Sequence, residues 1–511
     1  MIGNVALVGI SLVTGWAALY PARRGLGPVL YHLAALPVGA VGWTLAASLW
    51  SFAGSPPSAG TTLLGLTVWA TFVAAAARGL GADGTAEVSW RGYAGFGGAL
   101  AALAGGLAAS RLTQVGFDSY SHYELSGWYL FDTGHISDVI ISSRSVLIPA
   151  LHAADRLMGS DWTYVVYPVF SAHVLAILGW ALWAGAFAAL EPVRRAAATG
   201  FVCLSVALIP AWVFHTWFVH SNMVSAMYLT LSVAAVLAAA GAFSAGSRHA
   251  LSPAAAGLVA GAAAAGLVHA RPDGLAYAFV PLALLAVCHV AGLIPRNGVL
   301  AAYAGLLVPL AAAYGAAFHR LGLWDGKLQG RTALALLAAT VVFGAATLAV
   351  PMSRIPRWVL SDGNMLKVAA LLNVVLVGWL FRQRYGPVFN AVKNMIANLF
   401  FSGGWGVTWF ALVLALIVSL LFPFQGPSAR WNRLLLYAVF QFFMIAVFVH
   451  GTSHTGRVST NDSFNRVALH VVPLAFWYFA SYAGGLLSRD TLAAGAPAER
   501  PVEEAASPPA A

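Results

Sequence analysis

The sequence predicts an all-α protein that crosses a membrane many times. Of its 511 residues, 60% are hydrophobic and 9% are charged, whereas a soluble domain carries about 25% charged residues. The mean hydropathy is +0.79. Apolar runs recur from Ile2 to Leu487, and many have roughly the 17–25 residues that a helix needs to cross the hydrocarbon layer. Because lipid cannot satisfy backbone polar groups, these runs are expected to be helices.

The apolar runs predict about fifteen spans. In chain order they cover 2–20, 28–50, 61–77, 93–109, 163–189, 198–214, 221–241, 254–269, 274–293, 298–317, 331–350, 366–381, 405–422, 434–450 and 468–487. Two shorter stretches, 145–158 and 386–400, have polar residues on one side and are expected to lie in the membrane interface. The first run lacks a basic segment before it and a small-residue cleavage site after it, which favours a retained helix over a signal peptide.

Loop charges give an expected orientation. If the helices alternate, slightly more of the 27 Lys and Arg residues fall on one side, and that side is predicted to be cytoplasmic. Residues 1–492 then form one transmembrane domain, with segments 110–162 and 451–467 outside the cell. Residues 493–511 are predicted to be a disordered cytoplasmic tail. We interpret the net charge of +10 as an attraction to anionic lipid and expect no nucleic-acid partner.

Polar residues gather in the longest predicted outer loop, 110–162. The stretch GFDSYSHYELSGWYLFDTGH, 116–135, contains Asp118, His122, Glu124 and Asp132. Asp118 is the acid nearest the preceding helix, so we expect it close to the membrane surface. A carboxylate there could deprotonate an acceptor hydroxyl while a lipid-linked donor lies in the bilayer. Glu124 and Asp132 are expected to be acceptor contacts or solvated positions, and the alternative for the whole segment is a solvated loop.

Two other predicted outer loops carry cations. In HARPDGLAYAF, 269–279, a tight turn is expected to present Arg271 at the membrane surface, and the alternative is a plain charged hairpin. The last loop, 450–473, contains Arg457, Arg466, His454 and His470. A guanidinium can grip phosphate oxygens with two parallel hydrogen bonds. The alternative for Arg466 is snorkelling from a helix end.

Histidines also raise the question of a metal. In HTWFVHSN, His215 and His220 are five residues apart, which does not place both on one helical face, and no acid lies nearby. A zinc site is therefore not expected, and neither is another cofactor, although a divalent cation stays open. We expect these histidines and the aromatic residues between them to line a sugar or headgroup pocket.

The segment 116–136 resembles the first large outer loop of the GT-C membrane glycosyltransferases, which use polyprenyl-phosphate sugars. The turn at Arg271 is similar to an Arg/Lys-Pro-Glu/Asp-Gly turn of that family. The run from Arg466 to Pro473 is similar to a late element whose arginine contacts the lipid phosphate. The resemblance implies that Asp118 is the general base. Three extra helices before the first loop depart from the usual layout of the family.

The expected function is transfer of a sugar from a polyprenyl-phosphate donor to an extracytoplasmic glycan, lipid or protein in the inner (plasma) membrane. Asp118 would be the base, and the donor phosphate would be bound by Arg466, Arg271 and Arg457. Weaker substrate contacts are expected from His122, Asp132, His215, His220, His454 and His470. One alternative is a transporter or flippase of a lipid-linked glycan, which predicts internal repeats and charges at mid-helix depth. Another is an O-antigen-ligase-like transferase, a class with its large outer loop late in the chain.

Overall fold

The computed structural model describes residues 2–84, 86–110, 123–137, 140, 145–160, 165–218, 220–243, 251–271, 273–321, 328–349, 357–423, 429–452 and 463–495. In these ranges the regular elements are helices. They are α1 Ile2–Leu19, α2 Arg23–Ala53, α3 Ala59–Gly79, α4 Trp90–Ser110, α5 Leu125–Thr133, α6 Leu147–Leu157, α7 Val166–Ala181, η4 Leu182–Ala186, α8 Pro192–Ala207, α9 Pro210–Trp217, α10 Ser221–Ala239, α11 Pro253–Ala270, α12 Gly274–Val290, α13 Arg296–Leu321, α14 Leu328–Ala349, α15 Arg357–Leu360, α16 Asp362–Gln383, α17 Tyr385–Ala397, η7 Asn398–Ser402, α18 Thr408–Leu421, α19 Ala429–Thr452 and α20 Ser463–Gly495, with a short turn of helix, η1, at Tyr20–Ala22.

The prediction of an all-helical protein with many apolar spans is confirmed. Each predicted run coincides with a helix, or with the bent pair α8 and α9 in the case of 198–214. By length and hydropathy, the described part of the chain contains 10 candidate spans, or up to 11 if that pair, bent by 71°, is one span. This number is lower than about fifteen because α12, α18 and the apolar part of α14 are short, and because α1 and α2 count as one stretch.

Glycines allow α1 and α2 to pack against each other along their length. A Cβ atom on Gly15 of α1 would meet the backbone carbonyl of Ala35, and one on Gly39 of α2 would meet that of Ser11. Gly27, with φ +67°, lies at the bend where α2 begins its main run. Small residues let backbones approach closely, which is how helices associate in lipid. The two helices are therefore neighbours rather than one long rod.

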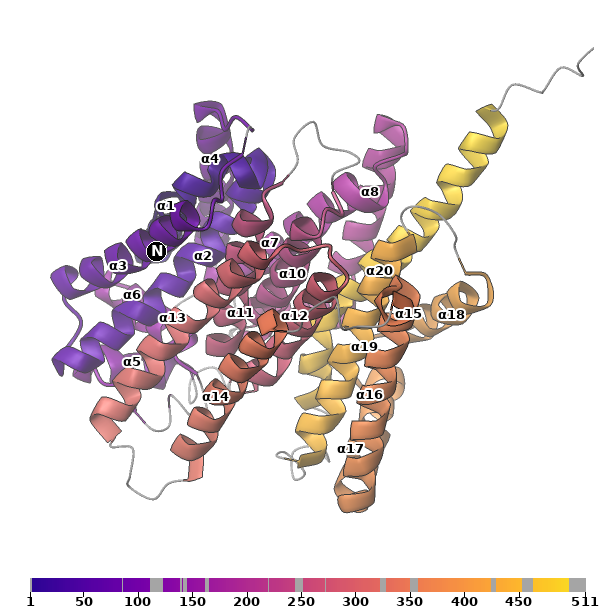
Figure 1. Cartoon of the computed structure of the whole chain (residues 1–511). Coiled ribbons are helices and arrows are strands. Elements are labelled where there is room, and N and C mark those ends of the chain that lie inside the picture. The colour runs from indigo at the N-terminus through magenta and orange to yellow at the C-terminus, as the bar shows by residue number, and fades with distance from the viewer. Residues whose placement is uncertain are drawn as a thin grey trace, which may run out of the picture.

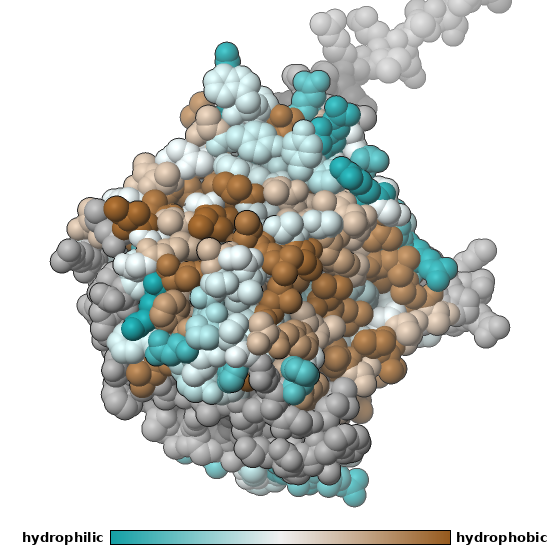
Figure 2. Space-filling view, turned by 90° about the vertical axis from the view of Figure 1, so that its left-hand side faces the viewer, coloured by the Kyte–Doolittle hydropathy of each residue, from teal (hydrophilic) through white to brown (hydrophobic). Residues whose placement is uncertain are grey.

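Apolar side chains form a band across one face of the molecule. Figure 2 shows this band across one face, with hydrophilic residues gathered above it and toward its lower edge. Large side chains such as Leu63, Phe201, Leu371 and Leu421 are exposed. In α16 only 6% of the apolar window is buried. Exposed apolar surface of this extent is expected where lipid is the solvent.

Two helices form the centre of the bundle. The apolar windows of α10 and α11 are 100% and 94% buried. Figure 1 shows α1–α3 and α6 on one side of them and α16–α20 on the other. Helices α10, α12 and α20 all begin at the same end of the bundle, because residues at their starts are hydrogen-bonded to one another. We call this the polar end, and the opposite end, where α10 and α20 continue to Phe243 and Ser481, the aromatic end.

The expectation for 145–158 is corrected by the structure. The matching helix, α6, is buried from Leu147 to Asp155, so it packs inside the protein rather than along the membrane surface. Its polar side faces protein partners, among them Tyr167, which contacts His152. The stretch 386–400 corresponds to α17 and η7, where few residues are buried. Helix α20 extends to Gly495, and the rest of the predicted tail lies outside the described residues.

Candidate functional site

Arg271 is held in a fixed position by a carboxylate and an amide at the polar end. Its Nε and Nη2 atoms donate to the two oxygens of Asp273 over 2.7 and 3.0 Å, and Nη1 donates to Asn222 Oδ1 over 2.9 Å. The arginine and aspartate side chains are 14% and 4% exposed. Burial raises the pKa of Asp273, but the guanidinium overrides it and holds that pKa below its usual range. Burial lowers the pKa of Arg271, but the neighbouring Asp273 carboxylate outweighs burial and raises that pKa above its usual value.

The turn that presents this pair depends on a glycine. A Cβ atom on Gly274 would meet the backbone carbonyl of Leu267 in α11, so no larger residue fits at the start of α12. Asp273 occupies the N-cap position of that helix, where a negative charge is favourable because the helix dipole is positive at its N-terminus. The short connection therefore sets Arg271 and Asp273 at the end of the bundle.

Arg466 and His220 form the second half of the cluster. Arg466 Nη1 donates to His220 Nε2 over 2.8 Å. Burial, together with the charges of Arg466 and Arg271, lowers the pKa of His220 well below its usual value, so the imidazole is neutral. Since a guanidinium cannot accept a proton, Nε2 is the acceptor and Nδ1 carries the hydrogen. Nδ1 lies 3.4 Å from Ser221 Oγ, which is 3.0 Å from the hydroxyl of Tyr123.

Two more histidines surround these groups. His215 Nδ1 lies 3.4 Å from Asn222 Nδ2. His470 is fully buried with its ring against Tyr277 and Phe442, at centroid distances of 6.0 and 6.2 Å. Among the described residues, neither ring nitrogen of His470 has a hydrogen-bond partner. The electrostatic environment of His220 includes both His215 and His470, so all three belong to one cluster.

The charges of this cluster suit an anion. Among the residues named above, two are guanidinium cations and one is a carboxylate, and His220 is neutral. Arg466 stands in the first turn of α20, where a cation is disfavoured by the helix dipole and an anion is favoured. Arg466 is partly exposed, so a ligand can reach it. We call Arg271, Asp273, Asn222, His220 and Arg466 the polar-end cluster.

The predicted site residues divide into three groups. Arg271, Arg466, His215, His220 and His470 lie together, although they come from three separate parts of the sequence. Asp132 is exposed in α5 and is not a member of the polar-end cluster. The others lie outside the described residues: Asp118, His122, His454 and Arg457. In the described ranges, no three His, Cys, Asp or Glu side chains are grouped as metal ligands would be.

The expectation that Glu124 is a solvated position is wrong. Its side chain is buried, and Oε2 lies 2.8 Å from His152 Nδ1. Sequence reasoning also missed Asn222, Ser221 and Tyr123 as partners. The run HSN at 220–222 offered one signal, because three consecutive polar residues stand at the start of a mostly apolar helix.

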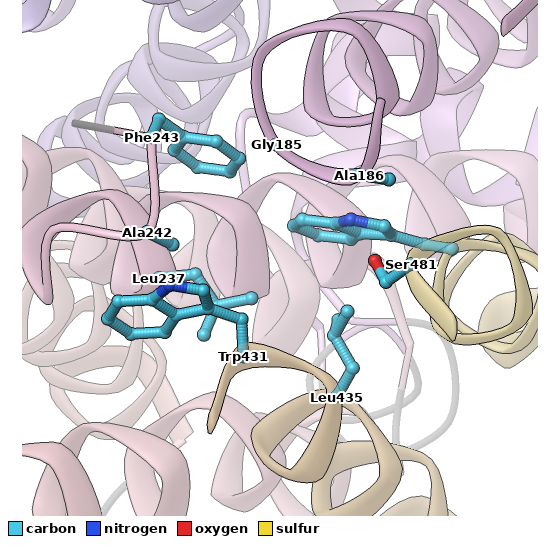
Figure 3. Close-up of a pocket in the computed structure, with 9 residues that line it drawn as sticks. Gly185, Ala186, Leu237, Ala242, Phe243, Trp431, Leu435 and Ser481 are labelled. Atoms are coloured by element: carbon cyan, nitrogen blue, oxygen red, sulfur yellow. The ribbon is translucent and has the colours of Figure 1, made fainter. Parts of the chain in front are cut away.

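The aromatic end contrasts with this cluster. Figure 3 shows a small pocket with Trp431 and Phe243 at its edges and Ser481 as its one hydroxyl. The cavity measures about 30 Å³ and is also lined by Trp477, Leu237 and Leu435. This space is enough for about one water molecule. It cannot hold a sugar or a phosphate.

Comparison with known proteins gives no relatives: no family model, curated protein or solved structure matches this chain.

Proposed function

We propose that this protein is a membrane glycosyltransferase that takes a sugar from a polyprenyl-phosphate donor and transfers it to a glycan, lipid or protein on the outer side of the plasma membrane. The donor phosphate would bind at Arg466, with Arg271 held beside it. Asp118 would take the proton from the acceptor hydroxyl. The proposal extends the GT-C resemblance of the loops that carry these residues.

The observation that carries this proposal is the pairing of Arg466 with a neutral histidine at the end of an apolar bundle. A lipid-linked phosphate must keep its chain in the bilayer and its charge near the surface, and a partly exposed guanidinium at a helix start matches that demand. Charge-assisted hydrogen bonds from Arg to phosphate are among the strong ones in proteins. In the transition state the departing phosphate gains negative charge, which a fixed cation stabilises.

Asp273 gives Arg271 a different role from Arg466. Three of the five N–H groups of Arg271 already donate to Asp273 and Asn222. Its charge is largely balanced, so we assign it to shaping the site rather than to gripping the phosphate. Arg466, which is partly exposed, would grip the phosphate. Neutral His220 would orient Arg466 without adding a positive charge.

The position of Asp118 in the chain is compatible with this assignment. Asp118 lies five positions before Tyr123, and an extended chain spans at most about 3.6 Å per residue, or roughly 18 Å in all. Tyr123 contacts Ser221, and its ring packs edge-on against His220 of the polar-end cluster. The base and the phosphate site would therefore belong to one active site.

A transporter of lipid-linked glycans is the rival. Transporters of that kind bind substrate near the bilayer midplane between repeated halves. The polar-end cluster instead stands at the starts of α10, α12 and α20. This position favours chemistry at the membrane surface over movement across the membrane.

The test uses the purified full-length protein in lipid nanodiscs with a pool of radiolabelled polyprenyl-phosphate sugars and an envelope extract as acceptor. We expect release of free polyprenyl phosphate that depends on the protein and on acceptor. Arg466→Ala should lower this release roughly 10- to 100-fold, and Arg430→Ala should not, because Arg430 stands in the first turn of α19 at the aromatic end. Movement of intact donor across the bilayer without release of polyprenyl phosphate would contradict the glycosyltransferase proposal and favour a transporter.

A further inference from the structure

A carboxylate, an imidazole and a phenol lie in a row beside the polar-end cluster. Glu124 Oε2 is 2.8 Å from His152 Nδ1, and His152 Nε2 is 2.6 Å from the hydroxyl of Tyr167. The three residues are 1%, 2% and 1% exposed. His152 of α6 contacts Glu124 directly, and Tyr167 of α7 holds His152 from its other ring nitrogen.

The neighbouring residue, Tyr123, faces the polar-end cluster instead. Its hydroxyl lies 3.0 Å from Ser221 Oγ, and its ring meets the ring of His220 edge-on with centroids 5.2 Å apart. Tyr123 and Glu124 are consecutive, so fixing one restricts the other. This two-residue unit thus connects a buried row of close polar contacts on one side with the histidine that binds Arg466 on the other.

The row is not needed to bring α5 and α6 together. A Cβ atom on Gly127 of α5 would meet the Cβ atom of His152, so these helices already pack backbone against side chain. This packing already restricts the rotation of α5 about its axis. The contact between Glu124, the residue before α5, and His152 adds a second restraint next to Tyr123.

We propose that Glu124, His152 and Tyr167 form a positioning relay that sets Tyr123 against His220 and thereby fixes the Arg466 guanidinium. None of the three is assigned a contact with substrate, and their effect on Arg466 passes through Tyr123. The relay rests on the proposed function only for the identity of the ligand at Arg466. Its geometric claim, that Tyr167 influences Arg466, stands by itself.

The experiment measures the rate at which phenylglyoxal modifies Arg466 in the full-length protein in nanodiscs, by mass spectrometry of the peptide. The proteins compared form a double-mutant cycle: wild type, Tyr167→Phe, Tyr123→Phe and the variant with both changes. Coupling between contacting residues predicts a rate about three- to tenfold higher in each single variant. The double variant should react no faster than Tyr123→Phe, because the relay acts through Tyr123.

The matched control is Tyr478→Phe. It also removes a buried hydroxyl, 2.7 Å from Ser419 Oγ, but it stands 12 residues beyond Arg466 on α20, about 18 Å along the helix. This variant should leave the rate at Arg466 unchanged. If Tyr167→Phe lowers the thermal midpoint more than Tyr478→Phe does, Glu124→Gln replaces it in the cycle, since the change keeps the size of the side chain.

Additive rates in the cycle, or an unchanged rate in a folded Tyr167→Phe protein, would overturn the relay. A separate arm adds farnesyl monophosphate, with farnesol as the uncharged control, and asks whether the phosphate protects Arg466. Absence of protection in wild type counts against the phosphate ligand of the proposed function. The relay is judged on the rates without ligand, so the two failures are distinguishable.

Discussion

The two ends of α10 and α20 differ in chemistry although the same helices build both. At the polar end, Arg466 and His220 join across 246 residues of sequence in a cluster of charged and polar side chains. At the aromatic end, Trp431, Trp477 and Phe243 enclose a cavity of about 30 Å³. Matched substitutions at the two ends should therefore have opposite profiles, with activity lost at one and stability alone altered at the other.

The largest expected effect on activity is at Asp118. Asp118→Asn keeps the size of the side chain but cannot accept a proton, and general-base catalysis contributes about 10²–10⁴-fold. Turnover in the purified donor–acceptor assay should fall by that order while donor binding persists. Asp132→Asn, which changes an exposed acid in α5, is the control. A large loss at Asp132 and little at Asp118 would move the base to Asp132.

The Arg271–Asp273 pair should show the largest effect on stability. Removing one partner of a buried ion pair costs about 3–5 kcal/mol, so Asp273→Ala should lower the free energy of unfolding by about that amount. The double change Arg271→Met with Asp273→Leu should cost less, because it leaves no unpaired charge. Chemical denaturation of the detergent-solubilised protein measures both. Equal losses of unfolding free energy in the single and double variants would contradict the pairing of Arg271 with Asp273 as a balanced ion pair.

The effect at Arg466 should be intermediate. Hydrogen bonds to charged groups contribute about 1.5–3 kcal/mol, which corresponds to roughly a 10- to 100-fold loss of donor use in Arg466→Ala. Arg466→Lys keeps the charge but loses the planar fork, and should lie between Ala and wild type. Arg430→Ala at the aromatic end is the control. Normal kinetics for Arg466→Ala would make snorkelling the better account of this residue.

A smaller effect concerns pH. Because folding lowers the pKa of His220, the folded state binds fewer protons there, and stability is lost as pH falls below the unfolded value of about 6.5. The loss should reach about 1.4 kcal/mol at pH 5.5 relative to pH 7.5. His220→Gln keeps an acceptor for Arg466 without titrating. Unfolding measured at both values should show a smaller difference for this variant, and an identical difference would contradict a neutral buried His220.

The smallest effect on activity is expected at the aromatic end. Trp431→Phe reduces the side chain beside the pocket and should lower stability by about 1–2 kcal/mol. Turnover of donor should stay at the wild-type level, because no atom of the pocket reaches the polar-end cluster. A marked loss of turnover in a folded Trp431→Phe protein would show that the aromatic end also controls activity, and would contradict the contrast between the two ends.

The sequence predicted the helices well and the site in part. Helix positions follow from hydropathy, which is local, so runs such as 221–241 and 254–269 match α10 and α11 closely. The gathering of Arg271 and Arg466 was expected from charge at predicted loop ends. The burial of Glu124 and of α6 was not predictable, because it depends on which helices pack over them. Nor could the sequence identify Asp273 and Asn222 as the hydrogen-bond partners of Arg271.

The distance in sequence between the halves of the cluster has a consequence for synthesis. His220 is joined to Arg466 by 246 residues, which a ribosome making about 5–20 residues per second needs roughly 12–50 s to add. Asn222 and Arg271 are only 49 residues apart and can meet early. A nascent chain therefore carries Arg271 in place, and Tyr123 against Ser221, long before Arg466 emerges. Placement of α20 is therefore the last event that completes the polar-end cluster, and a chain that ends before α20 lacks Arg466.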